Sequence, residues 1–368
     1  MPETATIIET PLAELHRSGG ATLATWFGCA LPDHWTDPRA EQELARNSVA
    51  LLDKNYRCYI SFAGLDRVRY LNAILTNNIK DLAAHHGNVS LLLNPQGHIL
   101  AEIETYALPD TLFCVSCAMI RARLLETLDK FIIMDDVTLT DESQCYGTLG
   151  LEGPRAAAVA KEVSGVDFSA LEDLQRTEAT VETIPCWVTK RSPGGVAGCE
   201  FLVERSKLTK LWEILASAAK NHEGGPMGYA ALSAQRLAQG IPWFGYDFGE
   251  KQIPHEAGLE KSHISYTKGC YTGQEIVERV RSRGQVNRRR VELLFDSADV
   301  PSANEPLLAG GKEAGLVTRA ALPSFLPHAI GMGYVRKDHN ALGSRLTWSR
   351  GTVTVAEFPG AFSSPPAR

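Results

Sequence analysis

The feature that most constrains the fold is a change of pattern near Val291. After it, the chain carries only short strand-like runs, such as VELLFD, AIGMGYV and TVTVAEF, separated by Gly, Pro, Ser and Asp. Before it, strand-like runs alternate with segments of helical period. Many short strands without a long helix are typical of a closed β structure. We therefore predict an α+β region over residues 1–290 and a small antiparallel β-barrel over residues 291–368, with AFSSPPAR as a frayed tail.

The region before the barrel divides into two α+β units, at roughly residues 50–140 and 145–240. In the first unit, the runs YRCYISF, VSLLL, HILAEIETYAL and TLFCVSC predict strands. An amphipathic segment at residues 66–79 and a helix at residues 119–134 accompany them. In the second unit, CWVTK and CEFLVE predict strands, and RAAAVAKEV and a segment capped by Ser206 predict helices. A last helix at residues 229–239 ends at Gly240.

The composition is that of an ordinary globular chain, with 44% hydrophobic and 22% charged residues among 368. The net charge of −6 and the pI near 6.0 argue against general nucleic-acid binding, which relies on a basic surface. No apolar stretch reaches the ~18 residues of a membrane span, and the N-terminus lacks a secretory pattern. We therefore expect a cytoplasmic protein without membrane contact.

The eight cysteines are too dispersed for a disulfide scaffold, so we expect reduced thiols. Cys114 and Cys117 form the one close pair, in an apolar run with strand character. No second pair and no histidine pair stands at zinc spacing. We predict no metal site there, because buried cysteine usually behaves as a small apolar residue.

The densest cluster of functional residue types runs from IPWFGYDF through IPHEAGLEKSHISY to KGCYTGQE at residues 268–275. Such crowding without a helical or strand period is typical of a site-building segment. Residues Thr272 to Glu275 fit a capping box, so we predict a helix that starts at Gly273. Cys270 would then precede a helix N-terminus. There the helix dipole and nearby Lys268 would lower the pKa of the thiol below its reference value of ~8.5 and so favour the thiolate. Cys270 is the best reactive-thiol candidate, and a cysteine packed in a Gly-rich turn fits the pattern equally well.

Three carboxylates and an arginine cluster are further candidates. Glu200 lies in the apolar run GCEFLVE, where either a ligand amine or a buried arginine would have to satisfy it. Asp247 and Glu256 flank the turn QIP and fit ligand contacts or solvated loop positions. The six arginines between Arg279 and Arg290 suit phosphates or a polyglutamate tail, and equally suit ion pairs between domains. No GxSxG elbow, Walker loop, dinucleotide fingerprint or HExxH motif occurs, which excludes the common motif-defined enzyme classes.

The run KGCYTGQE resembles the signature of YgfZ-type proteins, which are folate-dependent iron–sulfur maintenance factors related to the glycine-cleavage T-protein. The runs TNNI, LLLNPQGHILAE, LGLEGPRA, GCEFLVE, RLAQGIPWFGYDF and IPHEAGL extend the resemblance in the order that the superfamily uses. It covers residues 56–291 and extends to the barrel. The resemblance implies a T-protein-like ring of two ferredoxin-like α+β units and a C-terminal β-barrel around a central tetrahydrofolate pocket.

The resemblance also implies site residues. Glu200 resembles the T-protein glutamate that binds the pterin ring, and Cys270 with Lys268 would form the catalytic pair. The residues implied at pocket, framework or cofactor-binding positions are Asn94, Gly97, Arg236, Asp247, Glu256, Gly269 and Gln274.

Two departures from the T-protein pattern bear on function. Ala101-Glu102 stands where the T-protein has the Asp-Asp pair that supplies its catalytic aspartate, and Leu232 stands where it has an arginine near the folate.

Our first hypothesis is therefore an accessory protein that binds tetrahydrofolate or a one-carbon derivative and supports iron–sulfur enzymes or cluster-assembly proteins, including those that modify tRNA. Cys270 would be its essential group. The alternative is a folate-dependent aminomethyltransferase or demethylase in which Glu102 replaces the aspartate. Direct RNA binding through the arginine cluster is a third hypothesis, which the acidic net charge weakens.

Overall fold

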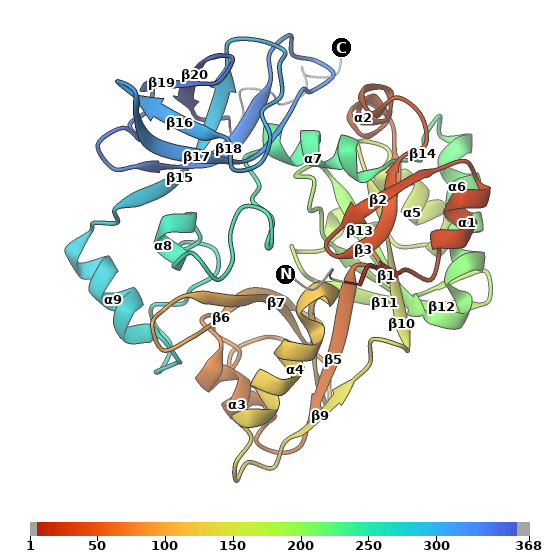
Figure 1. The fold of residues 1–368 in the computed structure, drawn as a ribbon. Helices are drawn as coiled ribbons and strands as arrows, with labels where there is room; N and C mark the ends of the chain where they lie inside the picture. Colours follow the sequence, from red (N-terminus) through yellow and green to blue (C-terminus); the bar gives the residue numbers. More distant parts are fainter. Residues whose placement is uncertain (1–5, 359–368) are drawn as a thin grey trace.

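Three packed units form a ring in the computed structural model, which describes residues 6–358 (Figure 1). The first α+β unit lies at the bottom of Figure 1, the second at the right and the barrel at the top. The segment that carries α8 (Pro254–Ala257) and α9 (Gln274–Arg283) closes the ring on the left. The predicted α+β architecture with a C-terminal barrel is confirmed.

The first unit is a five-stranded antiparallel sheet in the order β6-β7-β8-β5-β9, with α3 and α4 packed against it. Side chains alternate between the two faces along β7, as in any strand. Ala101 and Ile103 join the core beneath the helices, whereas Glu102 and Glu104 line a cavity on the other face. The elements are β5 (Arg57–Ala63), α3 (Arg67–Ile74), β6 (Gly87–Leu93), β7 (Ile99–Ala107), β8 (Leu112–Cys117), α4 (Arg121–Lys130) and β9 (Thr138–Asp141).

Both helices of this unit are shorter than predicted. α3 ends at Ile74, and the side chain of Asn72 accepts the Ile79 N–H across the following turn. α4 ends at Lys130, and Met134, the predicted last residue, is exposed. Apolar positions at helical spacing continue past each end, so the period alone does not reveal where the helix stops.

The second unit is a six-stranded sheet in the order β11-β12-β13-β10-β4-β14, packed against α5 and α6. Ser206 does not cap α6 as predicted, because it lies in a short 3-10 turn and its hydroxyl donates to the Glu204 carboxylate. The predicted helix at residues 229–239 is confirmed as α7. The elements are β4 (Ala50–Asp53), β10 (Tyr146–Glu152), α5 (Ala156–Ser164), β11 (Arg176–Val181), β12 (Ile184–Lys190), β13 (Gly198–Glu204), α6 (Leu208–Asn221), β14 (Gly225–Pro226) and α7 (Tyr229–Ala238).

The N-terminal segment forms a small sheet, in the order β1-β3-β2, that the sequence did not predict. Helix α2 and strand β3 pack against α7, which also contacts the barrel strands β17 and β18. Helix α7 therefore connects the N-terminal segment to the barrel. The elements are β1 (Ile8–Glu9), α1 (Ala13–Ser18), β2 (Thr22–Trp26), β3 (Cys29–His34) and α2 (Pro38–Asn47).

The C-terminal unit is a closed six-stranded barrel in the order β15-β18-β17-β16-β19-β20, as predicted. Its interior is filled by apolar side chains that include Leu293, Phe295 and Trp348. The predicted AFSSPPAR tail lies outside the described residues. No helix within residues 6–358 combines the length and apolar character that a membrane crossing requires. The strands are β15 (Arg288–Phe295), β16 (Pro306–Ala309), β17 (Lys312–Ala321), β18 (Ile330–Arg336), β19 (Arg345–Trp348) and β20 (Gly351–Ala356).

Candidate active site

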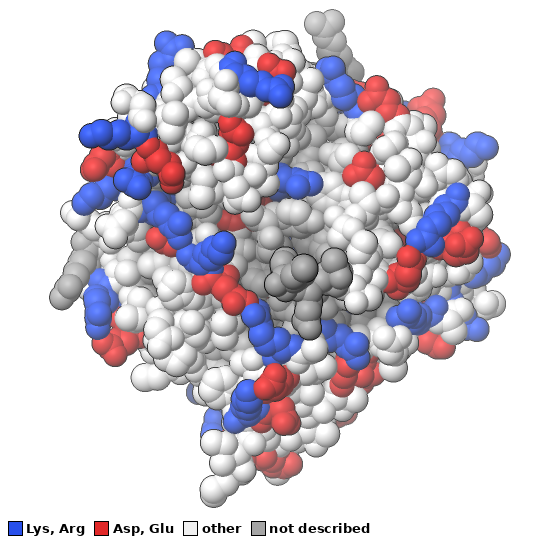
Figure 2. Space-filling view, viewed as in Figure 1, with Lys and Arg blue, Asp and Glu red and all other residues white. Residues whose placement is uncertain are grey.

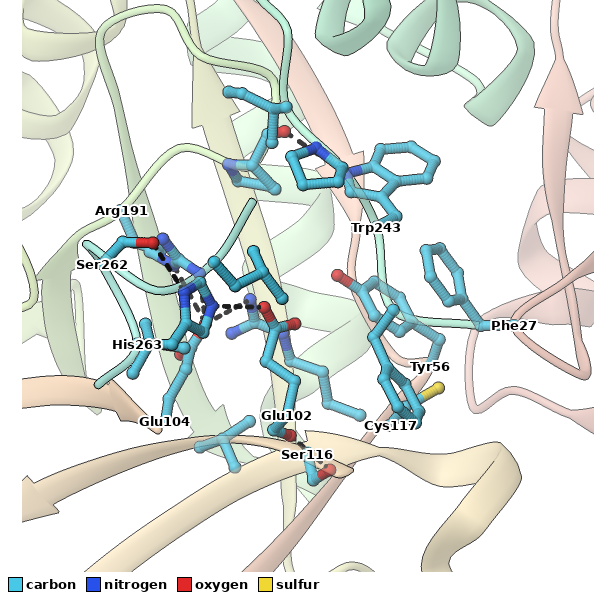
Figure 3. A pocket seen from close by; sticks show the side chains of 18 of the residues that line it. Phe27, Tyr56, Glu102, Glu104, Ser116, Cys117, Arg191, Trp243, Ser262 and His263 are labelled. Carbon is cyan, nitrogen blue, oxygen red and sulfur yellow. Dashed lines mark hydrogen bonds and ion pairs between the residues drawn. The ribbon is translucent and has the colours of Figure 1, made fainter. Parts of the chain in front are cut away.

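A cavity of about 360 Å³ lies where the units of the ring meet (Figure 3). Its floor is the free face of β7 and β8, and its walls come from the loop after β12, the loop after α7 and the segment after α8. The first strand of the barrel contributes Arg290. The segments predicted to build a site, IPWFGYDF and IPHEAGLEKSHISY, line much of it. The other residues discussed below that line the cavity are Phe27, Tyr56, Arg57, Glu102, Glu104, Arg191, Ser192, Trp243, Ser262 and His263.

Glu104, on the cavity floor, is neutralised by cations. Arg191 Nε lies 2.9 Å from Glu104 Oε1, Arg57 Nη2 lies 3.7 Å from the same oxygen, and Tyr106 donates a hydrogen bond of 2.9 Å to Oε2. Burial opposes ionisation of this carboxyl, but the guanidinium groups of Arg191 and Arg57 outweigh it and lower the pKa of Glu104 from 4.5 to about 2. Glu104 is therefore a carboxylate with its charge balanced.

The low pKa of Glu104 predicts a pH-dependent contribution to stability. Because the folded pKa lies below the unfolded one, the contribution is fully present above about pH 4.5 and is lost as the pH falls towards about 2. Glu104→Gln should lower the free energy of unfolding at pH 7 by on the order of 2–3 kcal/mol, and this deficit should shrink between pH 5 and pH 3. Urea unfolding across that range measures it, with the exposed Glu313→Gln as the control. A deficit that stays constant with pH would exclude this account of Glu104.

Glu102, two residues earlier on β7, has a different environment. Its Oε1 lies 3.0 Å from His263 Nε2, and no lysine or arginine within the described residues forms an ion pair with it. His263 Nδ1 lies 2.7 Å from the hydroxyl of Ser262. The side chain of Glu102 is 27% exposed and that of His263 is 11% exposed. Figure 3 shows the three side chains joined in a row across the cavity.

Aromatic rings form the opposite wall. Phe27 stacks on Tyr56 with ring centroids 4.2 Å apart, and Trp243 lies 5.3 Å from Phe27. The Trp243 loop is anchored by a buried ion pair between Arg236 and Asp247, in which Asp247 Oδ2 also accepts the Trp243 N–H at 2.9 Å. The predicted site residues Arg236 and Asp247 therefore position the wall and do not line the cavity.

Glu200 lies behind the cavity and does not line it. It is 3% exposed and makes a bidentate ion pair with Arg57, whose Nη2 lies 2.9 Å from Oε1. Lys54 Nζ lies 3.1 Å from the same oxygen and 3.3 Å from Glu152. Of the two partners that the sequence left open, the buried arginine is the one present. Glu200 holds Arg57 at the cavity, and its proposed contact with a pterin ring stays a prediction.

The remaining framework candidates also act at turns. Asn94 Oδ1 accepts the backbone N–H groups of Gln96 and His98, which fixes the β6–β7 turn. Glu256 accepts from Arg288 Nε at 3.1 Å, and Gln274 Oε1 accepts the Tyr271 N–H at 3.3 Å. None of these three side chains lines the cavity.

The KGCYTGQE segment is packed on the first unit, outside the cavity. Lys268 Nζ donates to the carbonyl oxygens of Asn72, Leu75 and Asn77 at the end of α3, and burial lowers the pKa of Lys268 to about 8. The predicted capping box at Thr272 is wrong. The N-cap of α9 is Gly273, at φ 81°, and no side chain caps the helix. Glycine is required at this position because a Cβ there would lie 2.7 Å from the Asn94 carbonyl oxygen.

Cys270 is an exposed free thiol, three residues before Gly273. Lys268 is directed to the three carbonyl groups at α3 and not to the thiol. Gly269 has an ordinary φ and open space around it, so the turn does not require a glycine there on steric grounds. The catalytic role predicted for Cys270 and Lys268 stays a prediction.

Five of the six arginines between Arg279 and Arg290 have described side chains, and each of these makes a contact within the protein. Arg279 pairs with Glu275, and the guanidinium of Arg281 lies 4.1 Å from the centre of the Tyr266 ring. The three consecutive arginines of β15 join the barrel to the segment around α8. Their partners are Glu256 for Arg288, Glu260 for Arg289 and the Ala257 carbonyl for Arg290. These contacts of Arg288, Arg289 and Arg290 pair the barrel with the rest of the protein, which is one of the two uses predicted for the cluster.

The sequence did not single out Tyr56, Arg57, Arg191, Ser262 or His263. Of these residues, only His263 lies in a segment that the sequence predicted to build a site, because of the crowded composition of IPHEAGLEKSHISY. Ser192 was also missed. Its hydroxyl is buried in the cavity wall without a hydrogen-bond partner in the described residues, so it is available to a bound molecule.

The charged residues on one face of the ring are mixed in sign, and the potential metal ligands are dispersed within residues 6–358. Figure 2 shows the face of the ring hollowed near its centre, with Lys and Arg interspersed among Asp and Glu around it. Within residues 6–358 no group of three or more His, Cys, Asp and Glu side chains is arranged to hold a metal.

Family models match most of the chain. The GCVT N-terminal domain matches residues 9–264, and the glycine cleavage T-protein C-terminal barrel domain matches residues 288–357. The chain therefore belongs to the glycine cleavage T-protein family.

Curated relatives and one solved structure agree with this membership. The chain is 26% identical to an aminomethyltransferase of Streptomyces avermitilis, over 91% of each chain, and 27% identical to one of Cutibacterium acnes, over 96% of this chain and 98% of that one. The fold is similar to that of the glycine cleavage system aminomethyltransferase T from Bartonella henselae, with a TM-score of 0.87 over 96% of this chain and 98% of that chain at 22% identity.

Proposed function

We propose that the chain catalyses folate-dependent transfer of an aminomethyl or related one-carbon group, with Glu102 as the acid–base group. The observation that carries this proposal is the contrast between two carboxylates on β7. Glu104 is neutralised by two guanidinium groups, whereas Glu102 faces the cavity and, within residues 6–358, is paired only with the His263 ring. A carboxylate in such a position can accept a proton from a bound amine. The aminomethyltransferase names of the relatives support the same chemistry.

The cavity residues fit tetrahydrofolate. The volume of about 360 Å³ lies within the roughly 300–1,000 Å³ of ordinary ligand pockets. The rings of Phe27, Tyr56 and Trp243 suit a flat bicyclic ring. The Glu102 carboxylate and the Ser192 hydroxyl, which has no partner among the described residues, suit its polar edge. When bound, the folate would supply the nitrogen that receives the one-carbon unit.

The chain's own residues would bind, exclude water and hold charge. The aromatic wall keeps water from the reacting groups, which strengthens electrostatic interactions inside the cavity. Arg57 and Arg191 keep Glu104 ionised, so Glu102 is left as the carboxyl group that exchanges a proton with the substrate. Ala101, its partner in the matched stretch, points into the core of the first unit and takes no part.

The test combines binding and turnover by the wild-type chain. Calorimetry measures tetrahydrofolate binding, and a coupled assay follows methylene-tetrahydrofolate formed from glycine- or sarcosine-derived aminomethyl groups. Saturable binding with product formation supports the proposal. Binding without product would overturn the transferase role, and absent binding would overturn the folate cavity itself.

A second candidate function is an accessory role in assembly or repair of iron–sulfur clusters, with iron–sulfur enzymes or cluster-assembly proteins as partners. It is supported by Cys270, an exposed thiol on a segment that Lys268 and Gly273 hold outside the cavity. An exposed thiol in a fixed loop is accessible to a partner protein, which a thiol inside the cavity would not be.

This second candidate predicts a specific effect of Cys270→Ser. The variant should lose most of the support that the chain gives to an iron–sulfur enzyme, measured as client activity in cells that lack the native protein. Cys145→Ser, which changes the other exposed thiol, should behave as wild type. Equal client activity with both variants would remove the accessory role for Cys270.

A further inference from the structure

We infer that Ser262 and His263 are positioning residues that hold Glu102 as a proton acceptor, and that protonation of the His263 ring switches the site off. The inference rests on the proposed function and adds a regulation by pH to the same site. It joins three side chains from two segments, β7 and the loop before KGCYTGQE, into one hydrogen-bonded row (Figure 3).

The order of the hydrogen bonds follows from the chemistry of a neutral imidazole, which has one donor nitrogen and one acceptor nitrogen. Ionised Glu102 is an acceptor only, so Nε2 of His263 must carry the proton that bridges the 3.0 Å to Oε1. Nδ1 must then accept, and the Ser262 hydroxyl, at 2.7 Å, is the donor. Ser262 therefore fixes the tautomer of the ring, and the ring fixes the orientation of the carboxylate.

The backbone holds this row in place. The His263 carbonyl accepts a hydrogen bond of 2.7 Å from the Thr76 hydroxyl, and the N–H groups of Ser262 and His263 both donate to the Leu259 carbonyl, at 3.2 and 3.0 Å. The segment is thus tied to the first unit beside β7. A ring held from both sides can present Nε2 to Glu102 without a search among rotamers.

Ser262 also gives the row an outer end. It lines both the cavity and an adjoining, more open pocket of about 690 Å³ between β6 and the loops after β12. Water in that outer pocket can exchange protons with the outer end of the row, while Glu102 at the inner end faces the bound substrate. A proton can therefore reach the ring from outside the cavity by way of the Ser262 hydroxyl.

The other charged groups that line the cavity beside the ring are Glu104, Arg57, Arg191 and Arg290, and Arg290 contacts only neutral acceptors among the described residues. Glu104 from β7 pairs with Arg191 and Arg57, and Arg290 from β15 donates to the Ala257 carbonyl. Glu102 is the carboxylate bonded to the ring. When the ring gains a proton, Glu102 acquires a full positive partner and becomes a weaker base, so the rate of proton acceptance falls.

The test is the pH profile of turnover in four variants. His263→Ala should lower kcat about 10- to 100-fold, the scale of outer hydrogen-bond partners, and leave the dissociation constant for tetrahydrofolate within about twofold. His263→Gln keeps an amide donor but has no ring to protonate, so it should recover most of kcat and move the acid limb of the profile to lower pH, where only protonation of a carboxylate remains. Ser262→Ala should give a smaller loss than His263→Ala. His328→Gln, an exposed histidine of the barrel unit, is the matched control.

The outcomes separate this inference from the proposed function. If His263→Ala turns over as fast as wild type, or if the acid limb of His263→Gln stays at the wild-type pH, the positioning role is overturned and the transferase remains intact. Absence of turnover in the wild-type chain would overturn both, because Glu102 would then accept no proton.

Discussion

Replacing Glu102 with glutamine is expected to reduce folate-dependent aminomethyl transfer by about 10²- to 10⁴-fold, the usual contribution of a positioned acid–base group. Glutamine keeps the size of the side chain and can still meet His263, so the cavity should keep its shape. It cannot take a proton from an amine. Tetrahydrofolate binding should therefore stay within about threefold of wild type, which places the loss in kcat.

The measurement is initial-rate kinetics with calorimetric binding on the same samples. Glu126→Gln, an exposed carboxylate of α4 in the same unit, is the matched control and should keep wild-type turnover. A Glu102→Gln variant that turns over like wild type would contradict the acid–base assignment, whatever its affinity for folate.

Replacing Asp247 with alanine should lower the free energy of unfolding by about 3–5 kcal/mol, because it leaves the Arg236 guanidinium buried without its counter-ion. Arg236 is fully buried, and its Nε and Nη2 have no hydrogen-bond partner in the described residues. Asp247 also accepts hydrogen bonds from the Trp243 N–H and the Thr318 hydroxyl, at 2.9 and 2.6 Å. The substitution therefore removes the anchor between the Trp243 loop and the barrel.

A double variant separates the ion pair from the cost of an orphaned charge. Arg236→Met combined with Asp247→Leu removes both charges and fills similar volume, so it should be more stable than Asp247→Ala alone. Urea unfolding followed by circular dichroism gives both values. A double variant less stable than the single one would show that the pair itself, and not the unpaired charge, carries the stability.

The sequence was informative about the fold where its pattern is local. Strand alternation predicted β5 to β8, and the loss of helical segments after Val291 predicted the closed barrel. Elements formed by distant pairing were missed. Strand β4 has four residues and pairs with β10 about 100 residues later, and β1 has two residues paired with β3. Such short strands have no period to detect and exist only because the rest of the sheet is present.

The candidate site was predicted at the level of segments and less well at the level of residues. The crowded segments around Trp243 and His263 do line the cavity. Glu200 stood out as a carboxylate in an apolar strand, but its partner Arg57 lies 143 positions earlier, and no local pattern distinguishes an arginine from a ligand amine. The sequence named Glu102 only as a substitute for a missing aspartate. Of the pair Ala101-Glu102, it is Glu102 that faces the cavity, because strand alternation turns Ala101 to the core.

The central claim is that folate-dependent transfer occurs in the cavity between the units and depends on Glu102. A crystal structure of the wild-type chain with tetrahydrofolate tests it most directly. The account predicts the pterin ring inside the cavity, against Trp243, with the Glu102 carboxylate in contact with the ligand and His263. A ligand bound elsewhere, for example at the KGCYTGQE segment beside Cys270, or a cavity that remains filled by water at saturating ligand, would contradict it.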